Sequence, residues 1–391
     1  MKACFVHDFP MIVRGEHVYS LGGFPYKVWE RYLKVFSELT VIGRRGQGDD
    51  IPLEKLILSS GPSVQFKTVP NLSSLRGKMT QKRKAIEIIR YQLEQSDALI
   101  ARLPSELGTL TVSIAKQLNI PYLIEVVGCG FNAYWHYGSL LGKLYAPISY
   151  IKTKRTVRKS KYTIYVTKKY LQERYPSFGE QENISNVEIS PTKQEVLEKR
   201  LKVTKNFKNK LRIGTIANID IKYKGVHIAI DAMKIIKDKG YDFEYHILGN
   251  GNKNHYSKQI KNHDLEKHII FAGSLSSREE VNNWLDQIDI YVQPSLTEGL
   301  PRAVIEAMNR GCPCVCTNVG GIPELISEEY LVYKNNPKQL ATQIIKLIKN
   351  KKKCEEQSIL NFENSKSYYN DKLEDKRIKF LQKFVQAEIK H

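Results

Sequence analysis

The chain has 391 residues, 41% of them hydrophobic, and a formal net charge of +20. A chain of this length predicts two or three domains, because one hydrophobic core seldom grows past about 250–300 residues. No apolar run reaches the ~20 residues of a membrane-spanning helix, and charged residues occur near the start, so we expect neither a span nor a signal peptide. The six cysteines lack the spacing of a secreted disulfide framework, which favours a reduced, cytoplasmic protein.

Strand and helix patterns alternate through the N-terminal half. A strand is predicted at residues 2–7, a loop at Gly22-Gly23 and a helix at residues 26–36. Further strands are predicted at residues 39–42, 98–101, 122–127 and 162–166. Short apolar runs separated by helical patterns are typical of a parallel α/β sheet.

A second alternation follows residues 190–210, where the pattern lapses into Ser-Pro-Thr and lysine-rich sequence. Its predicted strands are residues 211–217, 244–248, 269–271, 288–294 and 313–317. We therefore expect two domains, residues 1–195 and 205–370, each built on a parallel sheet. A charged helix is expected within residues 371–391.

The most informative segment is the strand-to-helix turn that follows residues 288–294. Gly299 permits a sharp turn, and Pro301 suits the first position of a helix. The unpaired amides at that helix start favour a bound phosphate. Glu298 precedes this position and Glu306 lies about 7 Å further along the helix at ~1.5 Å per residue. Two carboxylates around an anion site suit a phosphate-bearing ligand rich in hydroxyls, such as a nucleotide sugar.

The sequence around this turn, residues 291–326, strongly resembles a family signature. It has Glu298 and Glu306 with seven residues between them, then Gly311 to Val315, then a Gly320-Gly321-Ile-Pro-Glu324 loop. It resembles the C-terminal signature of retaining GT-B glycosyltransferases of family 4 (glycosyl transferases group 1). The resemblance implies an α/β fold of the GT-B type, with two Rossmann-like parallel-sheet domains facing a cleft and a C-terminal helix crossing back. It also implies that the first domain binds the acceptor and the second the nucleotide sugar.

The resemblance assigns donor-binding roles residue by residue. Family members carry an arginine and a lysine after the first strand of the second domain, and Lys224 matches the lysine. Asn218 stands where the arginine is expected, and Lys222 either replaces that charge or is solvated. The expected donor-binding residues are Gly22, Gly23, Asn218, Lys222, Lys224, Gly249, Leu275, Glu298, Gly299, Leu300, Pro301 and Glu306.

The acceptor side departs from the family pattern. Many relatives have a histidine shortly after the strand at residues 123–127, but this chain has Gly128-Cys-Gly-Phe-Asn132 there. His136, the nearest histidine, either reaches the site or packs among aromatic residues on the surface. We expect residues 128–138 to form an acceptor loop, with Asn132, Tyr134 and Trp135 on the acceptor side, because aromatic rings stack on sugars.

The resemblance implies sugar transfer with retention at the anomeric carbon. Lys224 and the helix-start amides would stabilise the leaving diphosphate, Glu298 would hold sugar hydroxyls and Glu306 the ribose diol. Lys224, Glu298 and His136 are the expected catalytic residues. The chain lacks an Asp-x-Asp motif, so we expect no catalytic metal and no cofactor beyond the donor. Two alternatives remain open: a GT-B nucleotide-sugar epimerase, and a non-catalytic carbohydrate- or lipid-binding relative.

The expected partners are a UDP- or GDP-sugar and a glycan or polyprenyl-linked acceptor in bacterial surface polysaccharide synthesis (capsule, exopolysaccharide or O-antigen). Basic residues cluster at 152–161, at Lys78 with 82–84, and at 346–353. We find no nucleic-acid-binding motif and expect no nucleic acid. We interpret the first two clusters as contacts with an anionic membrane, which attracts each Lys or Arg by ~1 kcal/mol. We interpret the third cluster as a solvated face. We therefore expect a cytoplasmic protein peripheral at the inner face of the cell membrane.

Cysteines 312, 314 and 316 lie close enough together in the sequence to suggest a metal site at first. Their period of two places them on one face of a predicted buried strand, where cysteine behaves as a small hydrophobe. The pattern therefore predicts packing rather than metal binding.

Overall fold

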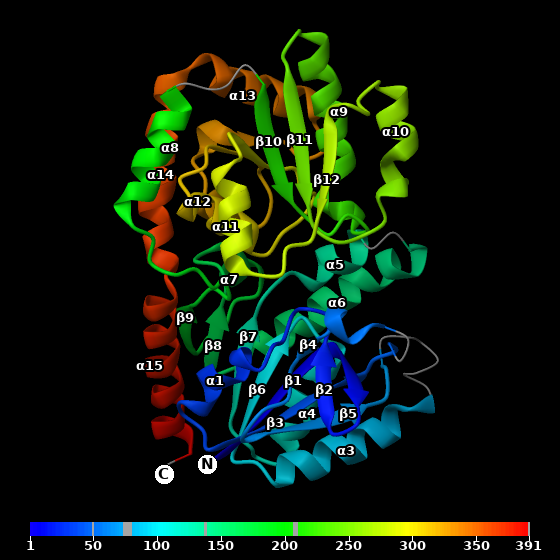
Figure 1. The fold of residues 1–391 in the computed structure, drawn as a ribbon. Helices are drawn as coiled ribbons and strands as arrows, with labels where there is room; N and C mark the ends of the chain where they lie inside the picture. The colour runs from blue at the N-terminus through cyan, green and yellow to red at the C-terminus, as the bar shows by residue number, and fades with distance from the viewer. Residues whose placement is uncertain (49–50, 73–79, 137–138, 206–209, 390–391) are drawn as a thin grey trace. The chain divides into compact units, whose positions relative to one another are not determined.

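The computed structural model describes residues 1–48, 51–72, 80–136, 139–205 and 210–389. The chain forms two compact units, each built on a β-sheet with helices (Figure 1). Unit 1 comprises Met1–Phe131, Ala146–Ile184 and Glu374–His391. Unit 2 comprises Asn132–Tyr145 and Ser185–Leu373. The predicted α/β class is confirmed.

The sheet of unit 1 is mainly parallel, in the order β5-β3-β1-β6-β7-β8-β9. Its strands are β1 (Lys2–Arg14), β2 (His17–Ser20), β3 (Glu38–Arg45), β4 (Ile57–Leu58), β5 (Val64–Val69), β6 (Ala98–Leu103), β7 (Tyr122–Val126), β8 (Tyr162–Tyr165) and β9 (Glu180–Asn183). Every residue of β6 is buried, as expected for a central strand covered on both faces.

Helices cover the sheet of unit 1. They are α1 (Lys27–Leu33), α3 (Lys82–Glu94), α4 (Glu106–Gln117), α7 (Tyr170–Arg174), most of α6 (Leu140–Arg158) and most of α15 (Asn370–Glu388), with a 3₁₀ turn η1 (Leu53–Lys55). Ser105 caps the start of helix α4, because its hydroxyl accepts a 2.8 Å hydrogen bond from the Gly108 amide. It packs on β1 and β6, next to α3.

A buried ion network joins four elements of unit 1. Glu125 on β7 accepts hydrogen bonds from Arg102 at 2.9 and 3.0 Å, Tyr32 at 2.9 Å and Arg377 at 2.8 Å. Burial alone would raise the pKa of Glu125, but the two arginines outweigh it and lower the pKa to about 2. Because Arg377 belongs to α15, this network fixes the C-terminal helix to unit 1.

Unit 2 is built on a parallel sheet in the order β12-β11-β10-β13-β14-β15. Its strands are β10 (Leu211–Ile216), β11 (Phe243–Leu248), β12 (Ile269–Gly273), β13 (Ile290–Gln293), β14 (Cys314–Thr317) and β15 (Leu331–Val332). The order reverses at β10, because β11 and β12 lie on one side of it and β13 on the other. In such sheets, ligands bind beyond the carboxyl ends of the strands at the reversal.

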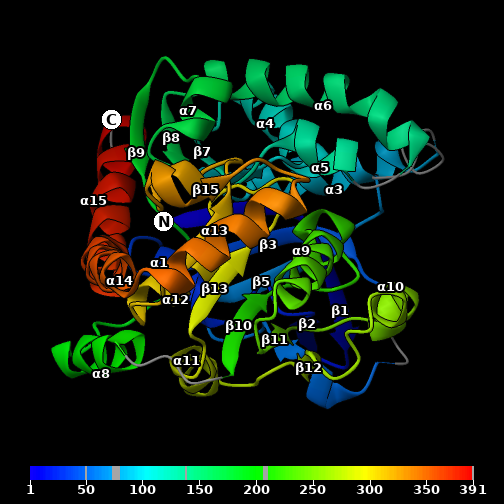
Figure 2. The same cartoon turned by 90° about the horizontal axis from the view of Figure 1, so that it is seen from above.

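The helices of unit 2 are α8 (Gln194–Lys205), α9 (Val226–Asp238), α10 (Ser257–Asn262), α11 (Arg278–Asp286), α12 (Arg302–Asn309), α13 (Pro337–Lys349) and α14 (Lys351–Ser365), with most of α5 (Gly130–His136). Short 3₁₀ turns are η2 (Lys222–Lys224), η3 (Lys253–Tyr256), η4 (Ile322–Glu324), η5 (Glu328–Tyr330) and η6 (Lys366–Tyr368). Helices α9 and α13 pack side by side (Figure 2). Ser277 and Glu280 form a capping box at the start of α11.

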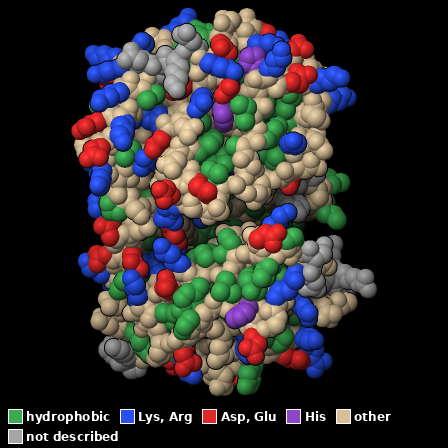
Figure 3. All heavy atoms as spheres, in the orientation of Figure 1, with side chains coloured by type: hydrophobic (Ala, Val, Ile, Leu, Met, Phe, Trp, Pro, Cys, Tyr) green, Lys and Arg blue, Asp and Glu red, His purple; other side chains and the backbone are tan. Residues whose placement is uncertain are grey.

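Two features of the N-terminal half differ from the prediction. Strand β1 continues past His7 to Arg14 and turns back at Gly15, which has φ 58°, to form an antiparallel hairpin with β2. Apolar side chains gather on the face of unit 1 that carries this hairpin (Figure 3), including exposed Leu21, Ile57 and Leu58. The hairpin was missed because its residues lack the apolar–polar alternation that predicts strands.

The second difference concerns the expected acceptor loop at residues 128–138. Residues Gly130–His136 form helix α5 instead, and residues 137 and 138 lie outside the described part. The Gly130 amide donates to the Tyr175 hydroxyl at 3.2 Å, so the first turn is satisfied without a preceding cap residue. No glycine or proline follows Gly130 before His136, so the backbone can continue as a helix.

Candidate functional site

The predicted strand-to-helix turn is present at the carboxyl end of β13. Strand β13 ends at Gln293 and α12 begins at Arg302, directly after Pro301. Pro301 has φ −71° and provides no side-chain cap. The first amides of α12 therefore keep the partial positive charge that attracts a phosphate.

Glu298, within this turn, is held by three donors. Its Oε1 accepts hydrogen bonds from Lys224 Nζ at 2.8 Å, Ser295 Oγ at 2.7 Å and Gln293 Nε2 at 3.3 Å. Gln293 in turn accepts from the hydroxyl of buried Tyr291 at 2.7 Å. Among the described residues, all three of these donors reach Oε1, and none is assigned to the second oxygen, Oε2.

The backbone at Glu298 is fixed by the glycine loop that follows β14. Gly320 has φ 60°, and a Cβ at this position would overlap the Glu298 carbonyl oxygen. The next amide, of Gly321, donates to the Gly299 carbonyl at 2.7 Å. The two glycines of the predicted Gly-Gly-x-x-Glu loop therefore pack against the turn that carries Glu298.

Glu306 lies one turn into α12 and is half-buried. Burial raises the pKa of this carboxyl, and the nearby charges of Arg302 and Arg278 oppose the rise. An ionised Glu306 is therefore under-solvated in the free protein. Hydroxyl groups of a ligand would supply the missing hydrogen bonds to it.

The turn after β10 carries the predicted phosphate-binding lysine. Lys224 ends the 3₁₀ turn η2, and its side chain is 23% exposed, against 8% for its partner Glu298. Asn218, in the place of the family arginine, directs its Oδ1 to the Asp220 amide at 3.0 Å. This side chain therefore closes its own turn. Lys222, two residues before Lys224, is exposed, and whether it replaces the arginine charge or is solvated stays a prediction.

Gly249 and Leu275 follow the next two strands of the sheet. Gly249 has φ 144°, and a Cβ here would overlap the Ala217 carbonyl oxygen. At Gly249 the turn after β11 therefore packs directly against the backbone of the turn after β10. Leu275 lies half-buried in the loop between β12 and α11. These positions, Lys224 and both glutamates belong to unit 2 and follow the carboxyl ends of its strands.

Gly22, Gly23 and His136 are not among the residues that follow the strand ends of unit 2. Gly22 and Gly23 are exposed and belong to unit 1, in the loop between β2 and α1. His136 ends helix α5, and burial lowers its pKa, together with the charges of Lys334 and Lys143. The imidazole is therefore biased to its neutral form. The catalytic role of His136 stays a prediction.

The aromatic residues of the acceptor side are on α5. Trp135 is 43% exposed, with Lys143 Nζ 6.0 Å from its ring centre. Tyr134 packs edge-on against Tyr145, at 5.1 Å between ring centres. Asn132 is half-buried on the same helix. An exposed tryptophan on a helix suits stacking on a sugar, and the acceptor role of these residues stays a prediction.

The cysteines at 312, 314 and 316 are buried, as predicted, and burial raises their pKa values. Within the described ranges, no group of three or more His, Cys, Asp or Glu side chains is arranged to hold a metal ion. The expected absence of a catalytic metal stays a prediction. In the same described residues, no helix has both the length and the apolar character needed to cross a membrane.

Sequence reasoning missed several charged and polar groups of the site. Gln293 and Ser295 support Glu298, and Arg278 and Arg302 lie near Glu306. A polar Gln293 within a buried strand was the available signal, because buried polar side chains need a partner. Arg278 gave no local signal, since it comes from another helix.

The two sheets match a known class of protein. The structure superposes on HepE from Anabaena, solved in complex with UDP and glucose, with a TM-score of 0.66 and 15% sequence identity. The match covers 99% of this chain and 100% of HepE. The fold is therefore GT-B, as the sequence resemblance implied.

Sequence comparison identifies the family. The model of the glycosyl transferases group 1 matches residues 198–359. Protein CapJ of Staphylococcus aureus is 34% identical over 383 residues, which cover 97% of this chain and 95% of CapJ. The amylovoran biosynthesis glycosyltransferase AmsK of Erwinia amylovora is 35% identical over 179 residues, which cover 43% of this chain and 42% of AmsK. The chain belongs to the group 1 glycosyltransferases.

Proposed function

We propose that this protein transfers a sugar, with retention, from a UDP- or GDP-sugar to a glycan or polyprenyl-linked acceptor. In this proposal residues 205–370 bind the donor and residues 1–195 the acceptor. The observation that carries it is the Lys224–Glu298 pair, 2.8 Å apart, next to the uncapped start of α12. A cation, a carboxylate and free amides together suit a diphosphate attached to a sugar.

Each group has a separate role in the proposed donor complex. The α12 amides and Lys224 would receive the diphosphate, and Oε2 of Glu298 would accept a sugar hydroxyl. Glu306 would accept the two ribose hydroxyls. Lys224 is satisfied by Glu298 in the free protein, so donor binding exchanges one anionic partner for another. Its stabilisation therefore grows mainly as negative charge develops on the leaving group.

The transfer step balances without a dedicated base. The bond between the anomeric carbon and the diphosphate breaks, and an acceptor oxygen bonds to the same carbon from the same face. The acceptor proton passes to the departing phosphate oxygen. A neutral His136 is compatible with this route but is not required by it. No step here needs a metal ion.

The relatives favour a role in surface polysaccharide synthesis. AmsK is named an amylovoran biosynthesis glycosyltransferase, and WcaL of Escherichia coli, 36% identical over 144 residues, a putative colanic acid biosynthesis glycosyltransferase. The HepE structure contains UDP and glucose, which supports a UDP-sugar as the first donor to examine. The sugar, the acceptor and the linkage are left open by these names.

We also propose that the protein works at the anionic inner face of the membrane. Residues 140–151, which precede the basic stretch 152–161, form the first part of α6. Five of their apolar side chains are exposed: Leu140 by 75%, Leu141 and Leu144 by 67%, Ile148 by 48% and Ile151 by 46%. An exposed apolar row beside basic residues supports interfacial binding. Of the second basic cluster, residues 82–84 lie on α3, and Lys78 is outside the described residues.

A donor screen tests the proposed activity. Thermal unfolding with UDP-, GDP- and ADP-sugars should show one preferred donor that stabilises the wild type but not Glu306→Ala. Product analysis with that donor alone separates the alternatives, because an epimerase would change the sugar without releasing it. A protein that no nucleotide sugar stabilises would favour the non-catalytic alternative and overturn the proposal.

A further inference from the structure

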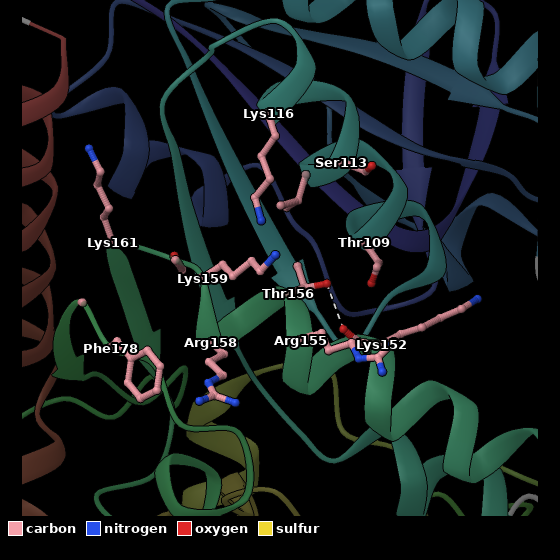
Figure 4. A pocket seen from close by; sticks show the side chains of 13 residues that line it. Thr109, Ser113, Lys116, Lys152, Arg155, Thr156, Arg158, Lys159, Lys161 and Phe178 are labelled. Carbon is pink, nitrogen blue, oxygen red and sulfur yellow. Dashed lines mark hydrogen bonds between the residues drawn. The ribbon is translucent and has the colours of Figure 1, made fainter.

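A groove on unit 1 is lined by basic side chains from two neighbouring helices (Figure 4). It encloses about 1060 Å³ between α4 and the C-terminal half of α6, next to the turn before β9. Its lining residues are Thr109, Val112, Ser113, Lys116, Lys152, Arg155, Thr156, Arg158, Lys159, Ser160, Lys161, Phe178 and Gly179. This lining includes six Lys or Arg residues and no Asp or Glu.

Some of these cations already have a partner. Lys152 lies 3.5 Å from Glu106, and Lys161 lies 2.9 Å from Glu388, both at the margins of the groove. Arg158 stacks on exposed Phe178, with its guanidinium carbon 4.7 Å from the ring centre. These contacts fix the rim of the groove.

The centre of the groove has an excess of positive charge. Burial, and secondly the charge of Lys159, lowers the pKa of Lys116. Lys116 contacts the Tyr122 ring at 5.3 Å, and no ion pair with a carboxylate is assigned to Lys116, Arg155 or Lys159 in the described part of the chain. Lys116 and Lys159 point toward one another (Figure 4), and two cations that meet without an acid are stabilised by a bound anion.

The groove continues the exposed apolar row of α6. The buried face of this helix carries Ala146, Ser149, Thr153 and Val157. On the opposite face, Ile148 and Ile151 are followed one turn later by Lys152 and Arg155, because residues four apart share a face. The exposed face of α6 therefore changes from apolar to basic between Ile151 and Lys152, and Lys152 is the first residue of α6 that lines the groove.

We propose that the α4–α6 groove binds the phosphate headgroup of an anionic membrane lipid, with Lys116 and Lys159 as its main ligands. The apolar row of α6 would contact the acyl region while the groove receives the phosphate. Arginine forks and lysine ammonium groups are the side chains that bind phosphate oxygens. This proposal refines the membrane contact proposed above, and it does not depend on sugar transfer.

A headgroup site makes a different prediction from diffuse attraction of a basic surface. Diffuse attraction depends on the number of charges and is lost with salt over a Debye length of about 10 Å. Ligands that converge on one phosphate prefer a terminal phosphomonoester, whose second negative charge is accessible, to a phosphodiester. All groove residues belong to unit 1, whereas Lys224, Glu298 and Glu306 belong to unit 2.

Vesicle binding by the full-length protein tests the proposal. Vesicles of phosphatidic acid and of phosphatidylglycerol are matched in surface charge, and binding is followed by sedimentation across a salt series. The wild type should bind the phosphomonoester vesicles about tenfold more tightly, the change expected of one charge-assisted hydrogen bond. Glycerol phosphate in solution serves as a competitor, because it carries the same phosphomonoester as phosphatidic acid but has no acyl chains.

Matched variants separate the groove from the general charge. Lys116→Gln and Lys159→Gln should each remove the preference for phosphatidic acid. Lys154→Gln, with the same charge change on α6, should retain it, because Lys154 contacts Tyr150 instead, at 3.5 Å. Thermal unfolding and donor-stabilisation measurements on each variant show that the fold and the donor site are intact.

Each outcome decides the proposal. Equal weakening by all three substitutions, or equal binding to both lipids, would show diffuse attraction and overturn it. Absence of vesicle binding at low salt would overturn it as well. Binding of glycerol phosphate as tight as that of the vesicles would support the phosphate site but reassign its ligand to a soluble compound. None of these results depends on whether sugar transfer is found.

Discussion

Replacing Lys224 by methionine isolates the charge at the proposed diphosphate site while keeping an unbranched side chain of similar length. In the free protein Lys224 Nζ lies 2.8 Å from Glu298 Oε1. The gross attraction is ~6 kcal/mol at an effective dielectric constant of about 20. Desolvation and solvent exposure cancel most of it, and Ser295 and Gln293 continue to donate to Glu298. We therefore expect the free energy of unfolding to fall by ~1–3 kcal/mol.

The effect on catalysis should exceed the effect on binding. Donor binding only exchanges Glu298 for the diphosphate as the partner of Lys224, so affinity should fall by less than about tenfold, or ~1.4 kcal/mol. Charge on the leaving group grows in the transition state, and the rate of turnover should fall by about 10²-fold or more.

Steady-state kinetics with the preferred donor and calorimetric affinities give the two quantities separately. Lys239→Met is a matched control, because Lys239 is exposed at the end of α9. A variant that loses donor affinity by about 10²-fold but keeps the wild-type turnover number would exclude a special role in the transition state, since Lys224 would then bind ground state and transition state equally.

Three further predictions concern other carboxylates and their partners. Glu306→Ala should abolish measurable donor binding in a folded protein, since two charged hydrogen bonds at ~1.5–3 kcal/mol each are lost. Burial raises the pKa of Glu306, so the affinity of the wild type for the donor should fall as the pH drops through that raised pKa. Arg377→Met should lower the free energy of unfolding by about 3 kcal/mol in urea titration, and the stability that Glu125 contributes should be present above its usual pKa of 4.5 and lost as the pH falls through about 2. Ser295→Ala should raise the activation free energy of turnover by ~1 kcal/mol, which is less than the increase expected for Glu298→Ala. Equal decreases in the turnover rate of the two variants would contradict a supporting role for the serine.

The strand-to-helix turn that carries Glu298 and Glu306 was predictable from the sequence. A strand, a glycine turn, a proline and an amphipathic helix follow one another within residues 288–309, so local rules determine where Glu298 and Glu306 lie. The loop that contains Gly320 was equally predictable, because its glycines precede a short 3₁₀ turn.

The parts that escaped prediction depend on contacts between distant segments. Arg377 lies 252 positions from Glu125, and no local pattern indicates that a charged surface-like helix carries one buried arginine. Lys116 joins the basic groove only because α4 packs beside α6, whereas the sequence showed the basic stretch 152–161 alone. Helix α5 was mistaken for a loop because the glycines at 128 and 130 suggested a turn, and tertiary contacts outweighed them.

The measurement that tests the central claim most directly is time-resolved NMR of the sugar released from the preferred donor, with water or a soluble glycan as acceptor. We predict that the first product keeps the anomeric configuration of the donor. Its release should be abolished by Glu298→Ala and strongly slowed by Lys224→Met. A first product of inverted configuration would contradict transfer with retention, and release that both substitutions leave unchanged would contradict the roles of Glu298 and Lys224.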